Sequence, residues 1–483
     1  MGATLKQLRR HRVPAWWTDA KFGVFIHWTP ASVIGWAPTD GDIGDIFATG
    51  RADALAHTPY TEWYENSLRF PDSPASRYHA EHHPGLRYTD LAGRFEDGLS
   101  QWDPTSWAAE FATAGARYVV LVTKHHDGYC LWPSEVANPR RTGWHTRRDV
   151  VGELAEAVRG AGMRFGIYYS GGLDWTFDDR PLGTFGDVIA ACPSGPYPDY
   201  AEAQVRELIS RYRPSVLWND ISWPTSRERL WNLFAHYYRA VPDGVVNDRF
   251  MPAAALSTAL RAAPVRRGLD AMLARAARKS GGQGLIPPEP PHYDVQTPEY
   301  TVFEDVRRRP FEVVRGMDLS FGYNRASTPE QFLSERELLG TLSDVAAKGG
   351  NLLLNVGPRG EDAAIPEPQL DRLRWIADWQ ASTSRSLLAT RPWVRPAATS
   401  PYGVELRFVS HGDEVRAVCH GDVVGPLTVP GVAPTPTTKV EVVVGGTRRA
   451  AAWRGVEGGI RVEVGVDGPV HWPVVALSQV DAS

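Results

Sequence analysis

Short apolar runs rich in β-branched and aromatic residues alternate with amphipathic stretches through most of this 483-residue chain. When a strand is followed by a helix and then by another strand, the two strands usually lie parallel in one sheet. About eight repeats of this unit favour a closed α/β fold, a (β/α)8 TIM-like barrel, over an open doubly wound sheet. The strands that we predict are Phe22–Trp28, Tyr118–His126, Arg164–Ser170, Val216–Asp220, Val245–Arg249, Thr297–Thr301, Leu319–Asn324 and Asn351–Val356.

The stretches between these runs have helical periodicity. In Arg148–Gly162, apolar residues recur from Val151 to Val158 at the spacing of one helix face, and a glycine ends the pattern. The same signals predict further helices at Tyr200–Tyr212, Arg227–Arg239, Pro329–Lys348 and Pro366–Thr383.

The pattern changes near residue 385, which we take as the end of a barrel domain that covers residues 1–385. Leu387–Gly403 contains prolines and no helical periodicity, so we predict a linker there. Alternating runs then follow at short spacing, which favours a C-terminal β-sandwich domain over residues 386–483. These runs are Gly403–Val409, Glu414–Cys419, Lys439–Val444, Gly459–Val464 and His471–Leu477.

An insertion at about residues 251–291 interrupts the alternation. It is rich in alanine and arginine in its first part and in glycine and proline in its second part. A segment of this length without predicted structure is usually either functional or disordered. We expect a mobile, solvated insertion. The alternative hypothesis is that it covers the mouth of a pocket and selects what enters.

The charge and hydropathy of the chain argue against two classes of partner. Lys and Arg total 52 and Asp and Glu total 56, whereas a nucleic-acid groove usually requires a basic face. No apolar run approaches the ~18 residues of a membrane span, and no apolar segment of a secretory signal follows the basic N-terminal residues. We therefore expect no nucleic-acid partner, no membrane partner and a cytoplasmic location.

The carboxyl ends of the strands in such a barrel meet at one rim, where active sites lie. This rule brings together two carboxylates, three imidazoles, a phenol, a guanidinium and an amide. The residues are His27, His125, His126, Tyr168, Asp220, Arg249, Glu299 and Asn355. Two carboxylates across a sugar cleft are the basic equipment of glycoside hydrolysis. For Asp220 and Glu299 the structural alternative is a helix N-cap or a surface salt bridge.

Tryptophan supports a sugar site only weakly. The chain has 18 tryptophans, whose flat rings commonly line sugar clefts but also fill large cores. Five lie in segments predicted near the rim, where we expect them to line a pocket: Trp28, Trp63, Trp175, Trp218 and Trp223.

Patterns for other chemistries are missing from the sequence. Adjacent His125 and His126 would point to opposite faces of a strand, so they cannot both bind one metal without a bend. The histidines of His79–His83 lack the HExxH spacing, and we expect that segment to be an exposed loop or helix. There is no G-x-S-x-G elbow, Walker A loop or G-x-G-x-x-G motif, and the three cysteines form no CxxC pair. We therefore predict no metal site.

Eight motifs, in order, resemble those of the α-L-fucosidases of glycoside hydrolase family 29. They are Trp16–Trp28, Thr61–Tyr64, Tyr118–Gly128, Phe165–Ser170, Leu217–Asp220, Val246–Arg249, Ser320–Tyr323 and Gly350–Pro358. The resemblance covers nearly the whole chain and implies a barrel followed by a β-sandwich. It also implies a retaining exo-glycosidase that removes terminal α-L-fucose from a fucosylated glycan or glycoside, through a covalent intermediate and without a cofactor.

Motif matching assigns the roles of individual residues. It implies that Asp220 is the nucleophile and that Glu299 is the acid/base. It implies a fucose pocket made of His27, Glu62, Trp63, His125, His126, Tyr168, Trp218, Arg249 and Phe321. The acid/base varies in position within the family, and Glu312 is the competing candidate. The insertion at residues 251–291 departs from the family pattern, because it lengthens the spacing between Arg249 and Glu299.

Alternatives to fucoside hydrolysis stay open at this point. A retaining glycosidase or transfucosidase acting on a related sugar such as an α-L-galactoside would share the pocket, because L-galactose differs from L-fucose by one hydroxyl. A catalytically weak fucose-binding protein would keep the pocket without turnover. The sequence specifies neither the linkage cleaved nor whether the chain forms a homo-oligomer.

Overall fold

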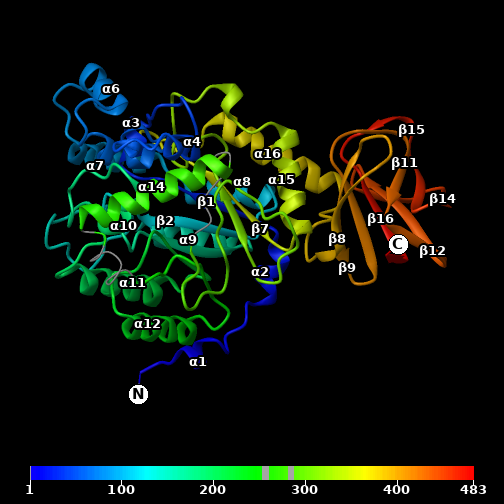
Figure 1. Ribbon diagram of the computed structural model, residues 1–483, viewed down its shortest axis with the longest axis horizontal. Coiled ribbons are helices and arrows are strands. Elements are labelled where there is room, and N and C mark those ends of the chain that lie inside the picture. Colours follow the sequence, from blue (N-terminus) through cyan, green and yellow to red (C-terminus); the bar gives the residue numbers. More distant parts are fainter. Residues whose placement is uncertain (1, 253–259, 261, 281–287, 483) are drawn as a thin grey trace.

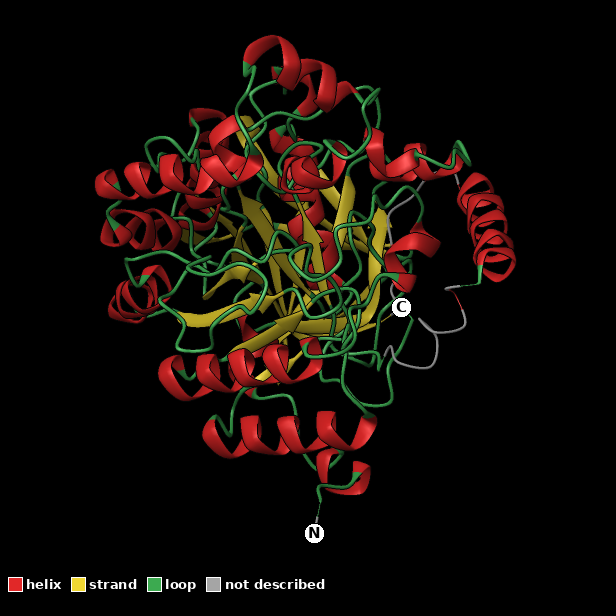
Figure 2. Ribbon diagram, turned by 90° about the vertical axis from the view of Figure 1, so that its left-hand side faces the viewer, coloured by secondary structure: helices red, strands yellow, loops and turns green. Residues whose placement is uncertain are grey.

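A computed structural model describes residues 2–252, 260, 262–280 and 288–482 (Figure 1). Its N-terminal part is a parallel sheet of seven strands in the order β5-β4-β3-β2-β1-β7-β6. Helices surround these strands, as a (β/α) barrel requires (Figure 2). The strands are β1 (Phe22–Ile26), β2 (Tyr118–Lys124), β3 (Arg164–Tyr169), β4 (Val216–Asn219), β5 (Val245–Val246), β6 (Glu312–Arg315) and β7 (Asn351–Val356).

An extended segment, residues 294–300, closes the sheet between β5 and β6. The amide of Asp294 donates to the carbonyl of Val246 on β5 at 3.0 Å. On the other side, a parallel bridge pairs Glu299 with Val314 on β6. The segment therefore occupies the eighth position of the barrel, where the sequence predicts a strand at Thr297–Thr301. The predicted fold, a TIM-like barrel followed by β-sheets, is confirmed.

One predicted strand of the barrel is wrong. Leu319–Asn324 forms a loop at the rim, and the strand lies earlier, at β6. β6 is only four residues long and begins at Glu312, a fully buried carboxylic acid, so the hydrophobic pattern does not reveal it.

Helix caps and buried faces explain the long helices. The side chain of Asp149 accepts the amide of Gly152 and so begins α9, whose buried face includes Val151, Leu154 and Val158. Among the described residues, no helix is both long and apolar enough to cross a membrane. The helices of eight or more residues are α6 (Pro74–His82), α7 (Leu91–Gly98), α8 (Pro104–Thr113), α9 (Val150–Gly160), α11 (Tyr197–Tyr212), α12 (Arg227–Ala240), α14 (Ala263–Ser280), α15 (Glu335–Ala347) and α16 (Glu367–Ser382). The shorter ones are α1 (Leu5–Leu8), α2 (Ala15–Ala20), α3 (Ala31–Ile34), α4 (Ile43–Ala48), α5 (Tyr64–Ser67) and α10 (Phe185–Ala190).

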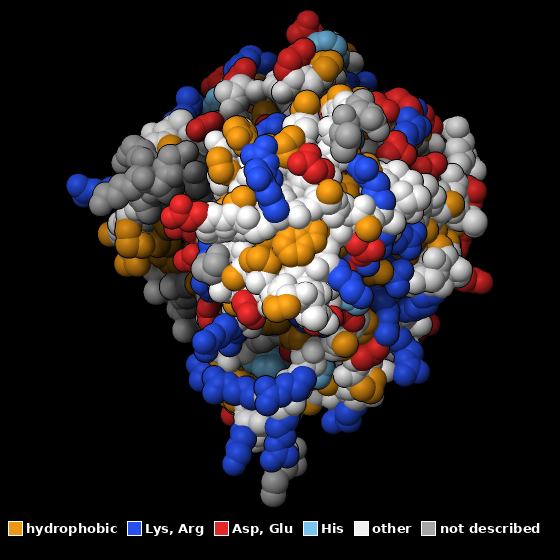
Figure 3. Space-filling view, turned by 90° about the vertical axis from the view of Figure 1, so that its right-hand side faces the viewer, with side chains coloured by type: hydrophobic (Ala, Val, Ile, Leu, Met, Phe, Trp, Pro, Cys, Tyr) orange, Lys and Arg blue, Asp and Glu red, His pale blue; other side chains and the backbone are white. Residues whose placement is uncertain are grey.

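The C-terminal part consists of two antiparallel sheets around an apolar core of their own. At this end of the molecule, charged side chains of both signs are mixed with scattered apolar ones (Figure 3). The six-stranded sheet has the order β13-β12-β16-β10-β9-β8, and the three-stranded sheet has the order β11-β15-β14. Their bounds are β8 (Arg391–Thr399), β9 (Glu405–His411), β10 (Glu414–Cys419), β11 (Val423–Pro430), β12 (Val432–Val444), β13 (Thr447–Ala450), β14 (Trp453–Val456), β15 (Gly459–Val470) and β16 (Val474–Ala482).

The linker predicted at Leu387–Gly403 is wrong over most of its length, because β8 lies there. β8 contains Pro392 and Pro396 and stands at the edge of the six-stranded sheet. Proline is tolerated on an edge strand, where fewer backbone donors are needed, so its presence did not exclude a strand.

The insertion predicted at residues 251–291 contains a helix, α14, so this part of it does have secondary structure, although most of its described side chains are at least partly exposed. α14 packs against α4 and α10 over the barrel rim. Its many arginines and alanines leave no clear apolar stripe, which is why periodicity did not predict it. The remaining parts of the insertion at residues 253–259, 261 and 281–287 lie outside the described residues.

A fully buried ion pair lies directly beneath the rim. β2 ends at Lys124, whose Nζ lies 2.7 Å from Oδ2 of Asp174 and 4.4 Å from the centre of the Tyr169 ring. The residues next in sequence to this pair reach the rim: His125 and His126 follow Lys124, and the amide of Trp175 donates to the carbonyl of His126 at 2.7 Å. The pair therefore fixes two rim segments relative to each other.

Lys124→Met should destabilise the barrel by about 3–5 kcal/mol, because it leaves the buried carboxylate of Asp174 without a countercharge. Denaturant unfolding monitored by circular dichroism measures this loss. Arg374→Ala is the control: it removes surface ion pairs with Glu367 and Asp371 and should change the stability by less than about 1 kcal/mol. Equal effects of the two substitutions would contradict the structural role of the buried pair.

Candidate active site

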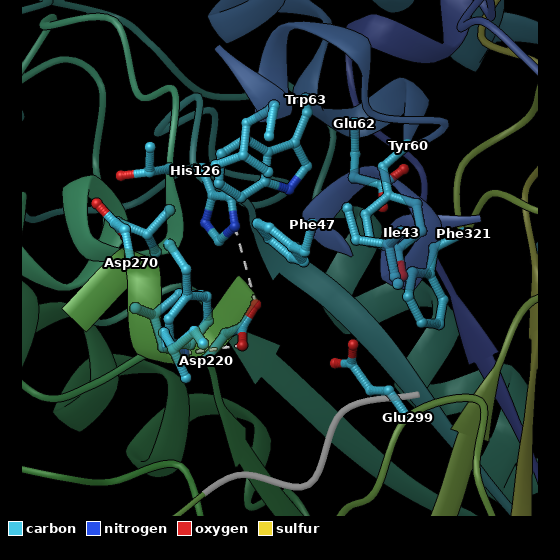
Figure 4. Close-up of a pocket in the computed structure, with 18 of the residues that line it drawn as sticks. Ile43, Phe47, Tyr60, Glu62, Trp63, His126, Asp220, Asp270, Glu299 and Phe321 are labelled. Carbon is cyan, nitrogen blue, oxygen red and sulfur yellow. Dashed lines mark hydrogen bonds and ion pairs between the residues drawn. The ribbon is translucent and has the colours of Figure 1, made fainter. Parts of the chain in front are cut away.

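A pocket of about 770 Å³ opens at the carboxyl ends of the strands (Figure 4). Every site residue that the resemblance implies lines it: His27, Glu62, Trp63, His125, His126, Tyr168, Trp218, Asp220, Arg249, Glu299 and Phe321. These residues come from distant parts of the sequence, and the rule of the barrel rim brings most of them together. Asn355 lies behind His27 instead of lining the pocket.

Asp220 follows β4 and is held by several donors. The Tyr168 hydroxyl donates to Oδ2 at 2.7 Å, and the amide of Ile221 donates to Oδ1 at 2.8 Å. Nε2 of His126 lies 3.8 Å from the same carboxylate (Figure 4). Ile221 has φ +65°, a left-handed conformation that is rare for a β-branched residue and occurs mostly at functional sites. The carboxylate is thus fixed in orientation, with its side chain 13% exposed to the pocket.

Arg249 joins the two carboxylates of the pocket. Its Nη1 lies 3.1 Å from Oδ1 of Asp220, and its Nη2 lies 2.7 Å from Oε1 of Glu299. The guanidinium also donates to the carbonyl of Thr297 at 3.0 Å and stacks over the Trp218 ring. Burial alone would lower the pKa of Arg249, but Glu299 and Asp220 raise it above its usual range, so the guanidinium stays charged.

Glu299 lies on the segment that closes the barrel. Burial raises the pKa of its carboxyl group, Arg249 opposes that rise, and the net shift is upward from the usual value. Tyr300, the next residue, has φ +52°, so both carboxylates are followed by a left-handed residue. A carboxyl group with a raised pKa and access to the pocket is suited to proton donation.

Glu312, the competing candidate, lies inside the barrel and does not line the pocket. The Tyr118 hydroxyl donates to its Oε2. Burial raises the pKa of Glu312 to about 7, so a shifted pKa alone does not distinguish it from Glu299. Position does, because only Glu299 can reach a ligand in the pocket.

The three histidines of the rim are neutral hydrogen-bonding groups. β2 ends at Lys124, so His125 and His126 lie in the turn beyond the strand, and both line the pocket despite being adjacent. Nδ1 of His126 lies 2.7 Å from Oγ of Ser170, and Nδ1 of His27 lies 2.6 Å from Oδ1 of Asn355. Burial lowers the pKa of His27 to about 4 and the pKa values of His125 and His126 well below the usual range. Neutral imidazoles can both donate to and accept from sugar hydroxyls.

Glu62 enters the pocket from a short helix, η2 (Thr61–Trp63), that the strand rule does not predict. The amide of Gly322 donates to its Oε2 at 3.0 Å. A Cβ atom on Gly322 would lie 2.4 Å from Oγ1 of Thr61, so only glycine allows this close approach. Burial raises the pKa of Glu62 to about 7.

Aromatic rings form the sides of the pocket. Phe321 stacks on His27 with ring centres 5.0 Å apart, and Trp63 packs edge-on against His126. Of the tryptophans expected there, only Trp63 and Trp218 line the pocket. The expectation is wrong for three others, Trp28, Trp175 and Trp223. Trp28 and Trp223, which lie beyond the ends of β1 and β4, belong to the core beneath the helices. Trp175 packs behind Trp63.

Other residues of the pocket had no signal in the sequence. Ile43, Phe47 and Tyr60 lie between the motifs Trp16–Trp28 and Thr61–Tyr64, and Asp270 and Leu273 belong to α14. Only the hypothesis of a covered pocket mouth pointed towards α14. Among the described residues, no group of three or more His, Cys, Asp and Glu side chains is arranged to hold a metal ion.

Comparisons with known proteins agree with this site. A family model described as Alpha-L-fucosidase matches residues 1–384. Tissue alpha-L-fucosidase of Mus musculus is 28% identical over 397 residues, which cover 79% of this chain and 72% of that protein. Alpha-L-fucosidase of Dictyostelium discoideum is 29% identical over 413 residues, which cover 81% of this chain and 75% of that protein.

Solved structures extend the similarity to the C-terminal sheets. An alpha-L-fucosidase superimposes with a TM-score of 0.83 and 36% identity, covering 98% of this chain and 99% of that one. Thermotoga maritima alpha-fucosidase in complex with fucose gives a TM-score of 0.78 and 36% identity, with 98% of both chains covered. The family model matches most of the chain, and the similarity of fold spans both of its parts. The chain therefore belongs to the α-L-fucosidase family.

Proposed function

We propose that this α-L-fucosidase is a retaining exo-glycosidase that removes terminal α-L-fucose by double displacement. In this proposal Asp220 is the nucleophile and Glu299 is the acid/base. The main support is the contact of both carboxylates with the single guanidinium of Arg249. One guanidinium holds both carboxylates at the same end of the pocket, and retaining enzymes use such a pair at a separation of ~5–5.5 Å. The fucose complex of the Thermotoga maritima relative supports the choice of sugar.

The floor of the pocket supports exo action. Phe25, Trp218 and Val314 line the pocket and are almost completely buried in the barrel interior. A chain of sugars cannot pass through a closed floor, so only a terminal residue can enter. The group attached to the anomeric oxygen must then point towards the mouth.

In the first step the Asp220 carboxylate attacks the anomeric carbon and the bond to the leaving oxygen breaks. Glu299 gives its proton to that oxygen, and a fucosyl–Asp220 ester forms. Tyr168 donates to Asp220 and keeps its proton, because burial raises the pKa of the phenol well above its usual range. Arg249 stabilises the carboxylate that Glu299 becomes as the proton leaves.

In the second step a water molecule enters where the leaving group was. Glu299 takes a proton from this water, and the oxygen attacks the anomeric carbon. The ester bond to Asp220 breaks, which restores its carboxylate and releases fucose with its original configuration. The neutral histidines and Glu62 are placed to hold the ring hydroxyls through both steps.

Asp220→Gly should reduce turnover of an aryl α-L-fucoside at least about 10⁴-fold, as the loss of a nucleophile does in other covalent catalysts. Added azide should restore part of the rate by attacking from the vacated side. Because one displacement inverts the anomeric carbon, the product should be β-L-fucosyl azide, which NMR identifies. Near wild-type turnover of the variant without azide would exclude Asp220 as the nucleophile.

Glu299→Gln should reduce kcat/KM for an alkyl fucoside about 10²–10⁴-fold, because an alkoxide leaves only when protonated. For a dinitrophenyl fucoside, whose leaving group needs no proton, the loss should be less than about tenfold. Glu312→Gln is the matched control and should leave both values within a few-fold of the wild type. If only Glu312→Gln shows the dependence on the leaving group, the acid/base assignment is wrong.

The pH profile of kcat/KM should have an alkaline limb that reports Glu299. The first step requires this group protonated, so activity is present below its pKa and is lost as the pH rises through it. Since burial raises the pKa of Glu299, the limb should lie above the range of an exposed glutamate. With an alkyl fucoside, whose leaving group needs the proton, the residual activity of Glu299→Gln should lack this limb. A limb that persists unchanged in this variant would assign it to another group.

A further inference from the structure

The pocket is larger than one sugar requires, and its outer part has a wall of its own. We call this outer part the vestibule and define it by α4, residues 49–55, the start of α10, and α14. The apolar side chains that line it are Ile43, Phe47, Phe185, Val188, Leu273 and Ala274. In Figure 4, Phe47 projects towards the open centre of the pocket. The vestibule therefore presents mainly hydrocarbon surface to a ligand.

Several polar side chains of α14 and α10, in this wall or behind it, are bonded to each other, whereas Arg267, which also lines the pocket, is exposed to solvent. Oδ1 of Asp270 accepts the amide of Gly186 at 2.8 Å, and a Cβ atom on Gly186 would lie only 2.7 Å from it. Arg266 pairs with Asp187 at 2.8 Å, and the Thr184 hydroxyl donates to the same aspartate at 3.0 Å. These bonds hold α14 against α10 and leave these groups engaged within the protein.

The residues between α4 and the barrel follow the same pattern. The Thr49 hydroxyl donates to the carbonyl of Ile46 at 2.6 Å, and Nε of Arg51 lies 2.9 Å from Oδ1 of Asp53. A second sugar in the vestibule would meet the exposed guanidinium of Arg267, but the engaged groups would return few of the hydrogen bonds to water that it gives up. Such unpaired desolvation is costly, whereas an apolar group gains from the same surroundings.

The inner chamber has the opposite chemistry. Within the described part of the chain, Nδ1 of His125 and the hydroxyl of Tyr60 are buried without a hydrogen-bond partner, and both residues line the pocket. Buried polar atoms in native proteins are nearly always paired, so a missing partner points to a ligand or water. The chamber is thus built for a polyhydroxylated ring and the vestibule for an apolar group.

We propose that the vestibule binds an apolar aglycone, so that the preferred substrates are α-L-fucosides of alkyl or aryl alcohols, not fucose attached to another sugar. This inference rests on the proposed function, since exo action directs the aglycone outward through the mouth that α4, α10 and α14 form. The order of the two parts along the pocket then matches the order of the two parts of the substrate.

Methyl and octyl α-L-fucoside provide a clean comparison, because their leaving alcohols differ little in acidity and strongly in apolar surface. We expect kcat/KM to be at least tenfold higher for the octyl fucoside, measured by release of free fucose. The octyl fucoside should also exceed fucosyl-α1,2-galactose, although a sugar hydroxyl is the more acidic leaving group. A ratio of octyl to methyl near one, or a preference for the disaccharide, would overturn the inference.

Adjacent residues of α14 provide matched variants. Leu273 lines the vestibule, whereas Met272 is 60% exposed and does not line it. Leu273→Ser should reduce the octyl-to-methyl ratio several-fold, and Phe47→Ala should reduce it about as much or more. Met272→Ser should leave the ratio unchanged. Equal ratios in all variants and the wild type would show that the vestibule does not contact the aglycone.

The two hypotheses fail in different ways. If wild-type enzyme cleaves none of these fucosides, nor a dinitrophenyl fucoside, the proposed function is wrong. If it cleaves the methyl and dinitrophenyl fucosides but gains nothing from the octyl chain, the function stands and only the assignment of the vestibule fails. Circular dichroism of each variant confirms that a changed ratio does not come from unfolding.

Discussion

The backbone hydrogen bonds of residues 294–300 complete the barrel, and the active site depends on them. Without this segment, β5 and β6 would be free edges and the rim would be open. The same segment carries Glu299, and its Thr297 carbonyl accepts a hydrogen bond from Arg249. The segment that closes the sheet therefore also places the acid/base candidate. The geometry of the site depends on a few main-chain hydrogen bonds.

The charged groups of the site are stabilised by ion pairing, whereas its histidines are kept neutral by burial. Arg249 lies between Asp220 and Glu299, so the buried positive charge offsets the two carboxylic groups that would otherwise repel each other. The histidines around them have lowered pKa values because the cost of charging them in the interior outweighs the attraction of the nearby Asp220 carboxylate. One pocket thus combines three paired charged groups with neutral imidazoles.

Much of the barrel and of its rim was predictable, because buried parallel strands have long β-branched runs and place polar residues where they end. Asp220 and Tyr168 follow directly from that rule. The same rule does not predict Glu62, which lies on the short helix η2, or the strand β6, which starts with a buried carboxylic acid. It cannot find α14, whose position depends on contacts with α10 and not on its own periodicity. Ile221 and Tyr300, which follow the two carboxylates, have positive φ angles, but isoleucine and tyrosine are not residue types that predict a left-handed backbone.

The prolines of β8 have a consequence for the molecule in concentrated solution. A sheet edge offers unpaired amides to any other chain, and edge-to-edge addition of strands is a common route to aggregation. Pro392 and Pro396 remove N–H donors from the edge strand of the six-stranded sheet. A second molecule therefore finds fewer N–H donors on this strand with which to extend the sheet. The two prolines that made β8 resemble a linker in the sequence thus also disfavour aggregation through this edge.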